Sequence, residues 1–163
     1  MTDRADNLIL LTFALEPVSY AISIHEVREV VPLPELTPLA DAPPFVAGIF
    51  NLRGKVVTAI DLRRRMGLAR RPWDRKTAIL VTPYREKLFG LIVDQALSLV
   101  QISSAEMEPA PDFSSFLGSL QSQFIAGVAK WEGRLVPILN AGRIFSVIEA
   151  HELGDWQAPE TDG

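Results

Sequence analysis

The side chains that most often carry catalysis are sparse in this chain. It has two histidines, His25 and His151, and no cysteine among its 163 residues. Ser23 lies two residues before His25, so both would share one face of a strand, but nothing nearby supplies a third group to orient the imidazole. Asp61 and Asp94 are better interpreted as a helix cap and a strand-end residue than as an acid–base pair. The pattern therefore predicts no enzyme, no cofactor and no metal site.

Basic residues gather in one segment of the chain. Such a run is able to bind nucleic acid or an acidic protein surface. A nucleic-acid site would also offer aromatic stacking or a groove-reading helix, but Trp73 is the only aromatic residue nearby and the net charge of the chain is −4. We therefore interpret the segment as a solvated short helix and linker, with contact to an acidic partner as the alternative. Its members are Arg63, Arg64, Arg65, Arg70, Arg71, Arg75 and Lys76.

One segment of the chain occurs twice, at a constant offset of 79 residues: residues 45–57 and residues 124–136. The leading Phe, both glycines and the apolar positions agree, so we expect the fold to need them. The polar turns differ, with Asn-Leu-Arg-Gly in the first copy and Lys-Trp-Glu-Gly in the second. Because the second copy has Glu132 where the first has Arg53, the fold does not require arginine in this turn. A guanidinium can form paired hydrogen bonds to a carboxylate, so Arg53 is predicted to contact a partner protein.

Six further residues complete the candidate binding surface. Val27 and Glu29 are two apart and share one face of an extended strand, where the valine would contribute apolar burial and the carboxylate would select a basic partner residue. A core valine beside a surface glutamate is an equally good interpretation. Asn51 is more typical of a side chain that bonds the turn backbone. The other three, for which a core position is favoured over partner contact, are Phe50, Val93 and Leu97.

The elements that carry these residues are predicted to be mainly β-strands, because short apolar runs alternate with a period of two. Five prolines from Pro32 to Pro44 argue for an irregular connection, since proline cannot donate to a sheet. Asp61 and Asn140 each precede a helical pattern and can cap it. We expect strands over residues 8–15, 20–24, 25–31, 46–51, 55–60, 77–81 and 89–100, and helices over residues 62–66, 114–120 and 142–153.

A second repeat, at an offset of 69 residues, relates residues 20–31 to residues 89–100. Each half thus has two strands, an irregular linker and two more strands, a spacing typical of small closed barrels. A polar break divides the halves into sub-barrels of about residues 8–75 and 76–145, and an exchange of strands between them stays open. Halves of roughly 70–80 residues are near the lower limit for an independent core. They should therefore share an apolar interface, with a groove between two lobes.

Composition indicates a folded globular protein, since 48% of the residues are hydrophobic. None of the apolar runs approaches the ~20 residues of a membrane helix. The first seven residues lack the features of a signal peptide, and the absence of cysteine fits a reducing compartment. We expect a cytoplasmic protein without membrane insertion, with flexible ends at residues 1–7 and 154–163.

Seven short segments stand in a characteristic order: Val-Arg-Glu-Val at 27–30, Pro-Pro-Phe-Val-Ala-Gly at 43–48, Asn-Leu-Arg-Gly at 51–54, Ile-Asp-Leu-Arg at 60–63, Gly-Leu-Ile-Val-Asp at 90–94, Phe-Ile-Ala-Gly-Val at 124–128 and Glu-Gly-Arg at 132–134. Together they resemble the CheW-like domain of bacterial chemotaxis. The resemblance implies one domain over residues 8–153, made of two packed five-stranded SH3-like barrels with short helices and a C-terminal helix. Asn140 stands where many members have Asp, and residues 16–19 lack the glycine common in that hairpin.

The resemblance also implies a function. CheW-like adaptors join methyl-accepting chemoreceptors to the histidine kinase CheA, without catalysis. The receptor's cytoplasmic tip lies in the groove between the lobes, and the regulatory domain of the kinase packs against the end of one barrel. Receptor contacts are implied at Val27 and Glu29, and a contact to receptor and kinase at Arg53. The alternative is an SH3-like barrel protein that binds nucleic acid or another acidic partner through the basic segment from Arg63 to Lys76.

Overall fold

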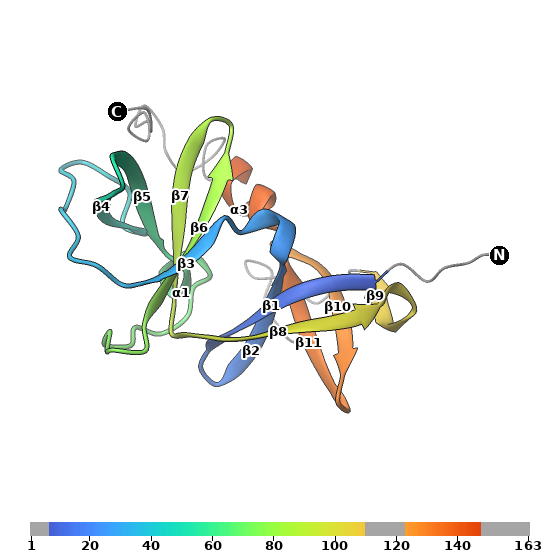
Figure 1. Ribbon diagram of the computed structural model, residues 1–163. Coiled ribbons are helices and arrows are strands. Elements are labelled where there is room, and N and C mark those ends of the chain that lie inside the picture. Colours follow the sequence, from blue (N-terminus) through green and yellow to red (C-terminus); the bar gives the residue numbers. More distant parts are fainter. Residues whose placement is uncertain (1–6, 110–122, 148–163) are drawn as a thin grey trace.

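The computed structural model describes residues 7–109 and 123–147, and these fold into two β-sheets with four short helices (Figure 1). The mainly β class is thereby confirmed. The helices are η1 (Ile24–Glu26), α1 (Leu62–Arg65), η2 (Ser104–Glu106) and α3 (Ala141–Val147). The strands are β1 (Asn7–Leu15), β2 (Val18–Ser23), β3 (Glu29–Pro32), β4 (Val46–Leu52), β5 (Lys55–Asp61), β6 (Ala78–Tyr84), β7 (Lys87–Val93), β8 (Gln95–Ser103), β9 (Met107–Pro109), β10 (Ile125–Trp131) and β11 (Arg134–Leu139).

Each sheet forms one lobe, and Figure 1 shows the two lobes side by side. Lobe 1 has the strand order β3-β6-β7-β5-β4, and lobe 2 has the order β8-β1-β2-β11-β10-β9. The two packed SH3-like barrels are confirmed, but lobe 2 has a sixth strand, the three-residue β9. The corresponding stretch of lobe 1 pairs only through a bridge between Thr37 and Ile49, in a connection whose prolines cannot donate to a sheet.

The two lobes do not follow the expected division at about residue 75. The β1–β2 hairpin pairs with β8 and β11 of the second half, whereas the β6–β7 hairpin pairs with β3 and β5 of the first. Two equivalent hairpins have therefore changed places, which is the strand exchange that the sequence left open. The exchange makes each lobe depend on both halves of the chain.

The 79-residue repeat extends to the pairing of the strands. The β4–β5 hairpin has a register shift between Val46 and Gly48, and the β10–β11 hairpin has the same shift between Ile125 and Gly127. A β-carbon on Gly48 would lie 2.6 Å from the carbonyl oxygen of Thr37, and one on Gly127 would lie 2.7 Å from the corresponding oxygen of Glu108. The repeated glycine is thus explained, because the neighbouring backbone approaches too closely for any side chain.

The predicted helix caps are confirmed. The side-chain oxygen of Asp61 accepts a hydrogen bond from the backbone N–H of Arg64 (3.2 Å), and that of Asn140 accepts one from Arg143 (3.0 Å). The asparagine therefore makes the capping hydrogen bond that an aspartate would make. The expected helix over residues 114–120, the end of the C-terminal helix after residue 147, and the ends proposed as flexible lie outside the described residues, except for residue 7 in β1.

Two of the expected strands are wrong in extent. Residues 25–31 do not form one strand, because Ser23 caps η1 through a hydrogen bond from His25 N (3.2 Å) and β3 begins only at Glu29. Residues 89–100 are interrupted at Asp94, whose backbone N–H donates to Ala14 O (3.0 Å). The chain passes from lobe 1 to lobe 2 at this interruption. The glycine-free turn at residues 16–17 contains a cis peptide bond before its proline.

Apolar side chains pack in three clusters. One fills the interior of lobe 1 around Val57, and a second fills lobe 2 around Ala21. The third and largest joins the lobes: it combines Phe13 and Tyr20 of lobe 2 with Phe89 of lobe 1 and with side chains from α1 and α3. Phe13 and Tyr20 stack at 6.0 Å, and Phe89 stacks on Phe145 of α3 at 4.5 Å. The expected apolar interface between lobes is therefore present.

Candidate functional site

Arg53 is held at the tip of the β4–β5 hairpin. Arg53 and Gly54 form a two-residue turn with φ angles of 51° and 86°, as in a type I′ turn. The side-chain oxygen of Asn51 accepts a hydrogen bond from Gly54 N (2.9 Å), so Asn51 has the structural role that its type favours. The Arg53 side chain is 70% exposed, and its Nη2 donates to Oε1 of Glu29. The structure thus brings together two of the predicted partner-binding residues.

The second copy of the repeat forms the same turn with a different side chain. Glu132 and Gly133 have φ angles of 50° and 74°, and Trp131 pairs with Arg134 across the turn. The backbone is therefore equivalent at Arg53 and Glu132, which supports the inference that the turn does not need arginine. The Arg53–Glu29 ion pair is exposed, and exposed pairs of this kind contribute little to stability.

The remaining candidates are divided between the core and the surface. Phe50 is 8% exposed and lies in the core of lobe 1, and Val93 is 1% exposed and lies in the cluster between lobes. Neither side chain is available to a partner in this structure, so the core alternative holds for both. Val27 is half-buried against the same inter-lobe cluster, at the end of η1. Leu97, on β8 of lobe 2, is 45% exposed.

A shallow hollow of about 310 Å³ lies where the two lobes meet. It is bordered by Val30 and Pro32 of β3, the edge strand of lobe 1, and by Gln95 and Ala96 of β8, the edge strand of lobe 2. Arg75 and Lys76 also line it, which places two positive charges beside the apolar walls. The expected groove between lobes is therefore present.

Val30 and Leu99 are exposed apolar residues that the sequence analysis missed. Val30 is 41% exposed on β3 and Leu99 is 61% exposed on β8. They occupy equivalent places: Val30 is opposite Leu80 and Leu99 is opposite Leu11, and both pairs are related by the 69-residue offset. Both residues lie within that repeat, but their equivalence became a signal for a binding surface only once the structure showed that both side chains are exposed. Together with Leu97, these residues put exposed apolar side chains on both strands beside the groove: Val30 on β3, and Leu97 and Leu99 on β8.

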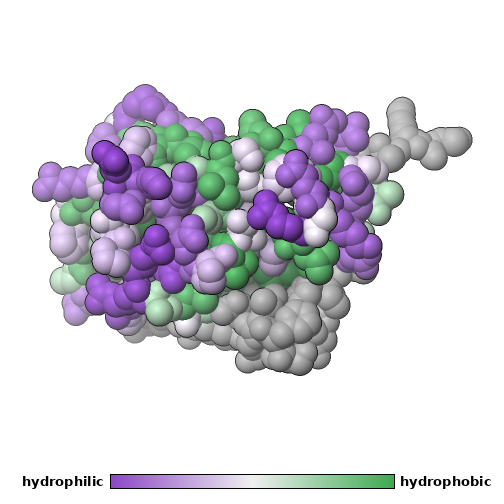
Figure 2. All heavy atoms as spheres, turned by 90° about the horizontal axis from the view of Figure 1, so that it is seen from below, coloured by the Kyte–Doolittle hydropathy of each residue, from purple (hydrophilic) through white to green (hydrophobic). Residues whose placement is uncertain are grey.

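The basic segment does not behave as one solvated surface. Arg65 is 4% exposed, with its guanidinium over the rings of Phe45 (5.3 Å) and Phe124 (4.9 Å). Arg63 forms a largely buried ion pair with Asp94, with 2.7 Å between Nη1 and Oδ2. Both arginines therefore support the fold, and the solvated interpretation is wrong for them. Figure 2 shows hydrophilic side chains over much of one face of lobe 1.

Glu26 links η1 to the last helix. Its Oε1 accepts a hydrogen bond from the backbone N–H of Ala141 (3.0 Å), the first residue of α3. Burial raises the pKa of this carboxyl, and hydrogen bonds from the backbone of Ala141 and Gly142 oppose that rise. The contact fixes α3 against the segment that leads into Val27.

Side chains considered for catalysis have structural roles here. Ser23 caps η1, Asp61 caps α1, and Asp94 pairs with Arg63. Among the described residues, no group of three or more His, Cys, Asp or Glu side chains could hold a metal ion. The helices described are all too short to cross a bilayer.

Comparisons of the sequence with known proteins support the two-lobed fold described above. A family model described as the CheW-like domain matches residues 10–149. The chain is 28% identical over 150 residues to chemotaxis protein CheW of Rhizobium meliloti (strain 1021), covering 89% of this chain and 95% of that protein. It is 30% identical over 143 residues to chemotaxis protein CheW of Helicobacter pylori (strain ATCC 700392 / 26695), covering 88% and 84%.

A solved structure extends this similarity to the fold. The crystal structure of scaffolding protein TtCheW from Thermoanaerobacter tengcongensis superimposes with a TM-score of 0.80 at 26% identity, covering 96% of this chain and 100% of that one. The sequence match and the structural match both span nearly the whole chain. This chain therefore belongs to the CheW-like family of chemotaxis proteins.

Proposed function

We propose that this chain is a non-catalytic adaptor that couples methyl-accepting chemoreceptors to the histidine kinase CheA. The observation that carries the proposal is full-length similarity to chemotaxis CheW proteins, one of which is described as a scaffolding protein. Two separate surfaces, a groove between lobes and a charged hairpin on lobe 1, offer the adaptor two places to bind. Coupled binding would then let the state of the receptor shift the activity of the kinase in the cytoplasm.

The groove is the proposed receptor site. Val30, Leu97 and Leu99 place exposed apolar surface on the two strands that border it. Covering such surface is the main source of binding free energy at protein interfaces. Because the groove takes one wall from each lobe, its width depends on how the lobes pack. A receptor tip held there would therefore sense the relative position of the lobes.

The Arg53 hairpin is the proposed kinase contact. The guanidinium carries five N–H donors, and the observed pair with Glu29 uses only one of them. A carboxylate on the kinase could therefore bind Arg53 while Glu29 keeps it oriented. Truncating one partner of a charged pair in an interface costs about 2–5 kcal/mol, so reversing the charge should weaken binding at least about 30-fold.

Binding of purified CheA regulatory domain, measured by titration calorimetry, tests this assignment. Arg53→Glu should weaken binding, and the matched control Arg134→Glu, at the equivalent hairpin of lobe 2, should not. If Arg134→Glu alone weakens binding, the kinase contact lies on lobe 2 and the assignment to Arg53 is wrong. If neither the kinase domain nor a receptor fragment from the same organism binds the unmodified chain, the adaptor function itself is refuted.

Receptor binding has its own matched pair of variants. Leu99→Glu places a charge beside the groove and should abolish binding of a receptor cytoplasmic fragment. Leu135→Glu makes the same change at a leucine that is 68% exposed on β11, away from the residues that line the groove. Equal effects of the two substitutions would contradict the groove as the receptor site.

A further inference from the structure

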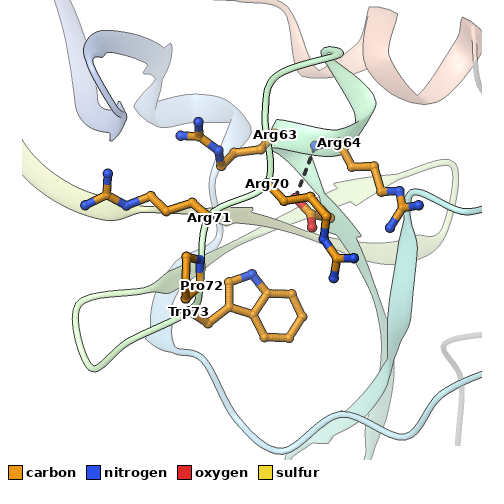
Figure 3. Close-up of a pocket in the computed structure, with 7 residues that line it drawn as sticks. Arg63, Arg64, Arg70, Arg71, Pro72 and Trp73 are labelled. Carbon is orange, nitrogen blue, oxygen red and sulfur yellow. Dashed lines mark hydrogen bonds between the residues drawn. The ribbon is translucent and has the colours of Figure 1, made fainter.

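A second hollow lies at the other end of β5 from the Arg53 hairpin. It has a volume of about 200 Å³ and is formed by α1 and the loop that follows it (Figure 3). Four arginines, one tryptophan, one proline and one carboxylate line it: Arg63, Arg64, Arg70, Arg71, Trp73, Pro72 and Asp61. We call it the arginine pocket. The seven residues of β5 separate it from Arg53 by about 20 Å, so it is distinct from the proposed kinase contact.

The four arginines of the pocket divide into two pairs. Arg63 is bound to Asp94 at 2.7 Å, and Nε of Arg71 lies 3.8 Å from the same carboxylate oxygen. Figure 3 shows these two side chains directed to one side, whereas Arg64 and Arg70 extend together to the other, into the space beside the Trp73 ring. The guanidiniums of Arg64 and Arg70 form no hydrogen bond or ion pair with any described residue.

The Asp61 carboxylate also lines the pocket, but it accepts a hydrogen bond from the backbone N–H of Arg64 and pairs with neither guanidinium. Two neighbouring positive charges that are not paired repel each other, and an anion between them removes the repulsion. Guanidinium groups match the oxygens of phosphate in geometry as well as charge. The backbone positions of both arginines are fixed: Asp61 caps α1 just before Arg64, and Nε of Arg63 donates to the carbonyl of Ala69, next to Arg70, at 2.8 Å. The pocket therefore presents two phosphate-binding side chains from a fixed backbone.

Trp73 adds a second kind of contact. Its side chain is 47% exposed and belongs to none of the apolar clusters in the described part of the chain. An exposed indole keeps apolar surface in contact with water and adds no burial to a core. Its flat face is a good surface on which a planar ring can stack. Phosphate-binding arginines next to such a face match a ligand that carries both a phosphate group and a planar base.

We propose that the arginine pocket binds a nucleoside phosphate, with the phosphate between Arg64 and Arg70 and the base on the Trp73 indole. A volume of about 200 Å³ holds a phosphate group and part of a stacked ring, with the rest of the ligand open to solvent. A nucleic-acid strand would need a longer basic track with several stacking rings, and the net charge of −4 opposes one. A nucleotide would thus act on this adaptor at a place separate from its protein partners.

Titration calorimetry of the full chain tests the proposal with four probes: GMP, AMP, inorganic phosphate for charge alone, and guanosine for the ring alone. At least one mononucleotide should bind more tightly than either phosphate or guanosine. Arg64→Ala and Arg70→Ala should each weaken nucleotide binding by about tenfold or more, as expected for loss of a hydrogen bond to a charged group. Trp73→Ala should weaken nucleotide binding and leave phosphate binding unchanged, and Trp73→Phe should restore part of it.

Arg75→Ala is the matched control, because Arg75 lies in the same basic segment and lines the inter-lobe groove instead. It should leave nucleotide affinity unchanged. The proposal is overturned if neither nucleotide binds, if nucleotide binds no more tightly than phosphate, if Arg75→Ala has the same effect as Arg64→Ala, or if a single-stranded oligonucleotide binds better than the mononucleotide. Binding of CheA, measured in parallel, is expected to survive Arg64→Ala, so failure here is distinguishable from failure of the adaptor function.

Discussion

Replacing Asp94 by alanine removes an acceptor that two segments of the chain share. Asp94 Oδ2 accepts hydrogen bonds from Arg63 Nη1 (2.7 Å) and from Glu16 N (2.8 Å). Arg63 lies in α1, directly after β5 of lobe 1, and Glu16 lies in the β1–β2 turn of lobe 2. Asp94 lies where the chain passes from one lobe to the other. The carboxylate therefore ties the lobes together, and its loss should destabilise the whole fold.

The expected loss in the free energy of unfolding follows from the burial of the Arg63–Asp94 ion pair. The side chains of Arg63 and Asp94 are only 13% and 11% exposed. Removing one partner of a buried ion pair typically costs about 3–5 kcal/mol, because the other charge is left uncompensated. Arg63 keeps hydrogen bonds to the carbonyls of Ala69 and Glu16, so we expect the lower end, about 3 kcal/mol for Asp94→Ala. A double-mutant cycle of Asp94→Ala with Arg63→Ala should give a coupling energy of about 2 kcal/mol.

Urea denaturation of the unmodified chain, both single variants and the double variant gives this coupling energy. The chain supplies a matched control in Lys130 and Glu108, whose 2.9 Å ion pair has side chains that are 58% and 53% exposed. Its coupling energy should stay below about 1 kcal/mol, since solvent screens it. Equal coupling in the two cycles, or an Arg63–Asp94 coupling near zero, would refute the claim that this pair holds the lobes together.

Two further predictions concern stability. Glu26→Ala should lower the free energy of unfolding by about 1 kcal/mol, because Ala141 N loses its acceptor, as at other helix N-termini. Burial raises the folded-state pKa of Glu26 above its usual 4.5, so the folded protein holds the proton more tightly than the unfolded chain. This group's contribution to stability should therefore fall as the pH rises from 4.5 through the folded pKa, and urea titrations should show that Glu26→Gln abolishes this slope. Gly48→Ala should cost more than about 2 kcal/mol in the same assay, since its β-carbon would meet Thr37 O at 2.6 Å, whereas Gly54→Ala, with nothing within 4 Å, should cost only the roughly 1–2 kcal/mol of a left-handed alanine.

Much of the local structure could be predicted from side-chain type. Asp61 and Asn140 predict the first residues of their helices, because a short polar side chain can accept hydrogen bonds from the free backbone N–H groups there. The turn at Asn51 to Gly54 was predictable because glycine permits the positive φ that the turn requires. Conversely, the boundary between η1 and β3 was missed, since Ser23 diverts the backbone into a short helix that periodicity does not reveal.

The candidate site was predictable only in part. Arg53 and Glu29 were identified separately, and their ion pair depends on a contact between distant strands. A core position was favoured over partner contact for Phe50 and Val93, and their burial in the structure supports the core position. Arg63 and Arg65 look like solvated charges in the sequence, but packing surrounds one with Asp94 and a backbone carbonyl and the other with two aromatic rings.

The sequence by itself determined that this protein is built twice from the same hairpins, with the same turns and caps, and that it resembles CheW-like adaptors. These features depend on neighbours along the chain and so are written in local side-chain types. Only the tertiary structure decided that the β1–β2 and β6–β7 hairpins change places. Both hairpins carry equivalent apolar patterns and suit either lobe, so the choice depends on connections and contacts across the whole fold. That choice sets β3 beside β8, and it thereby creates the groove between the lobes.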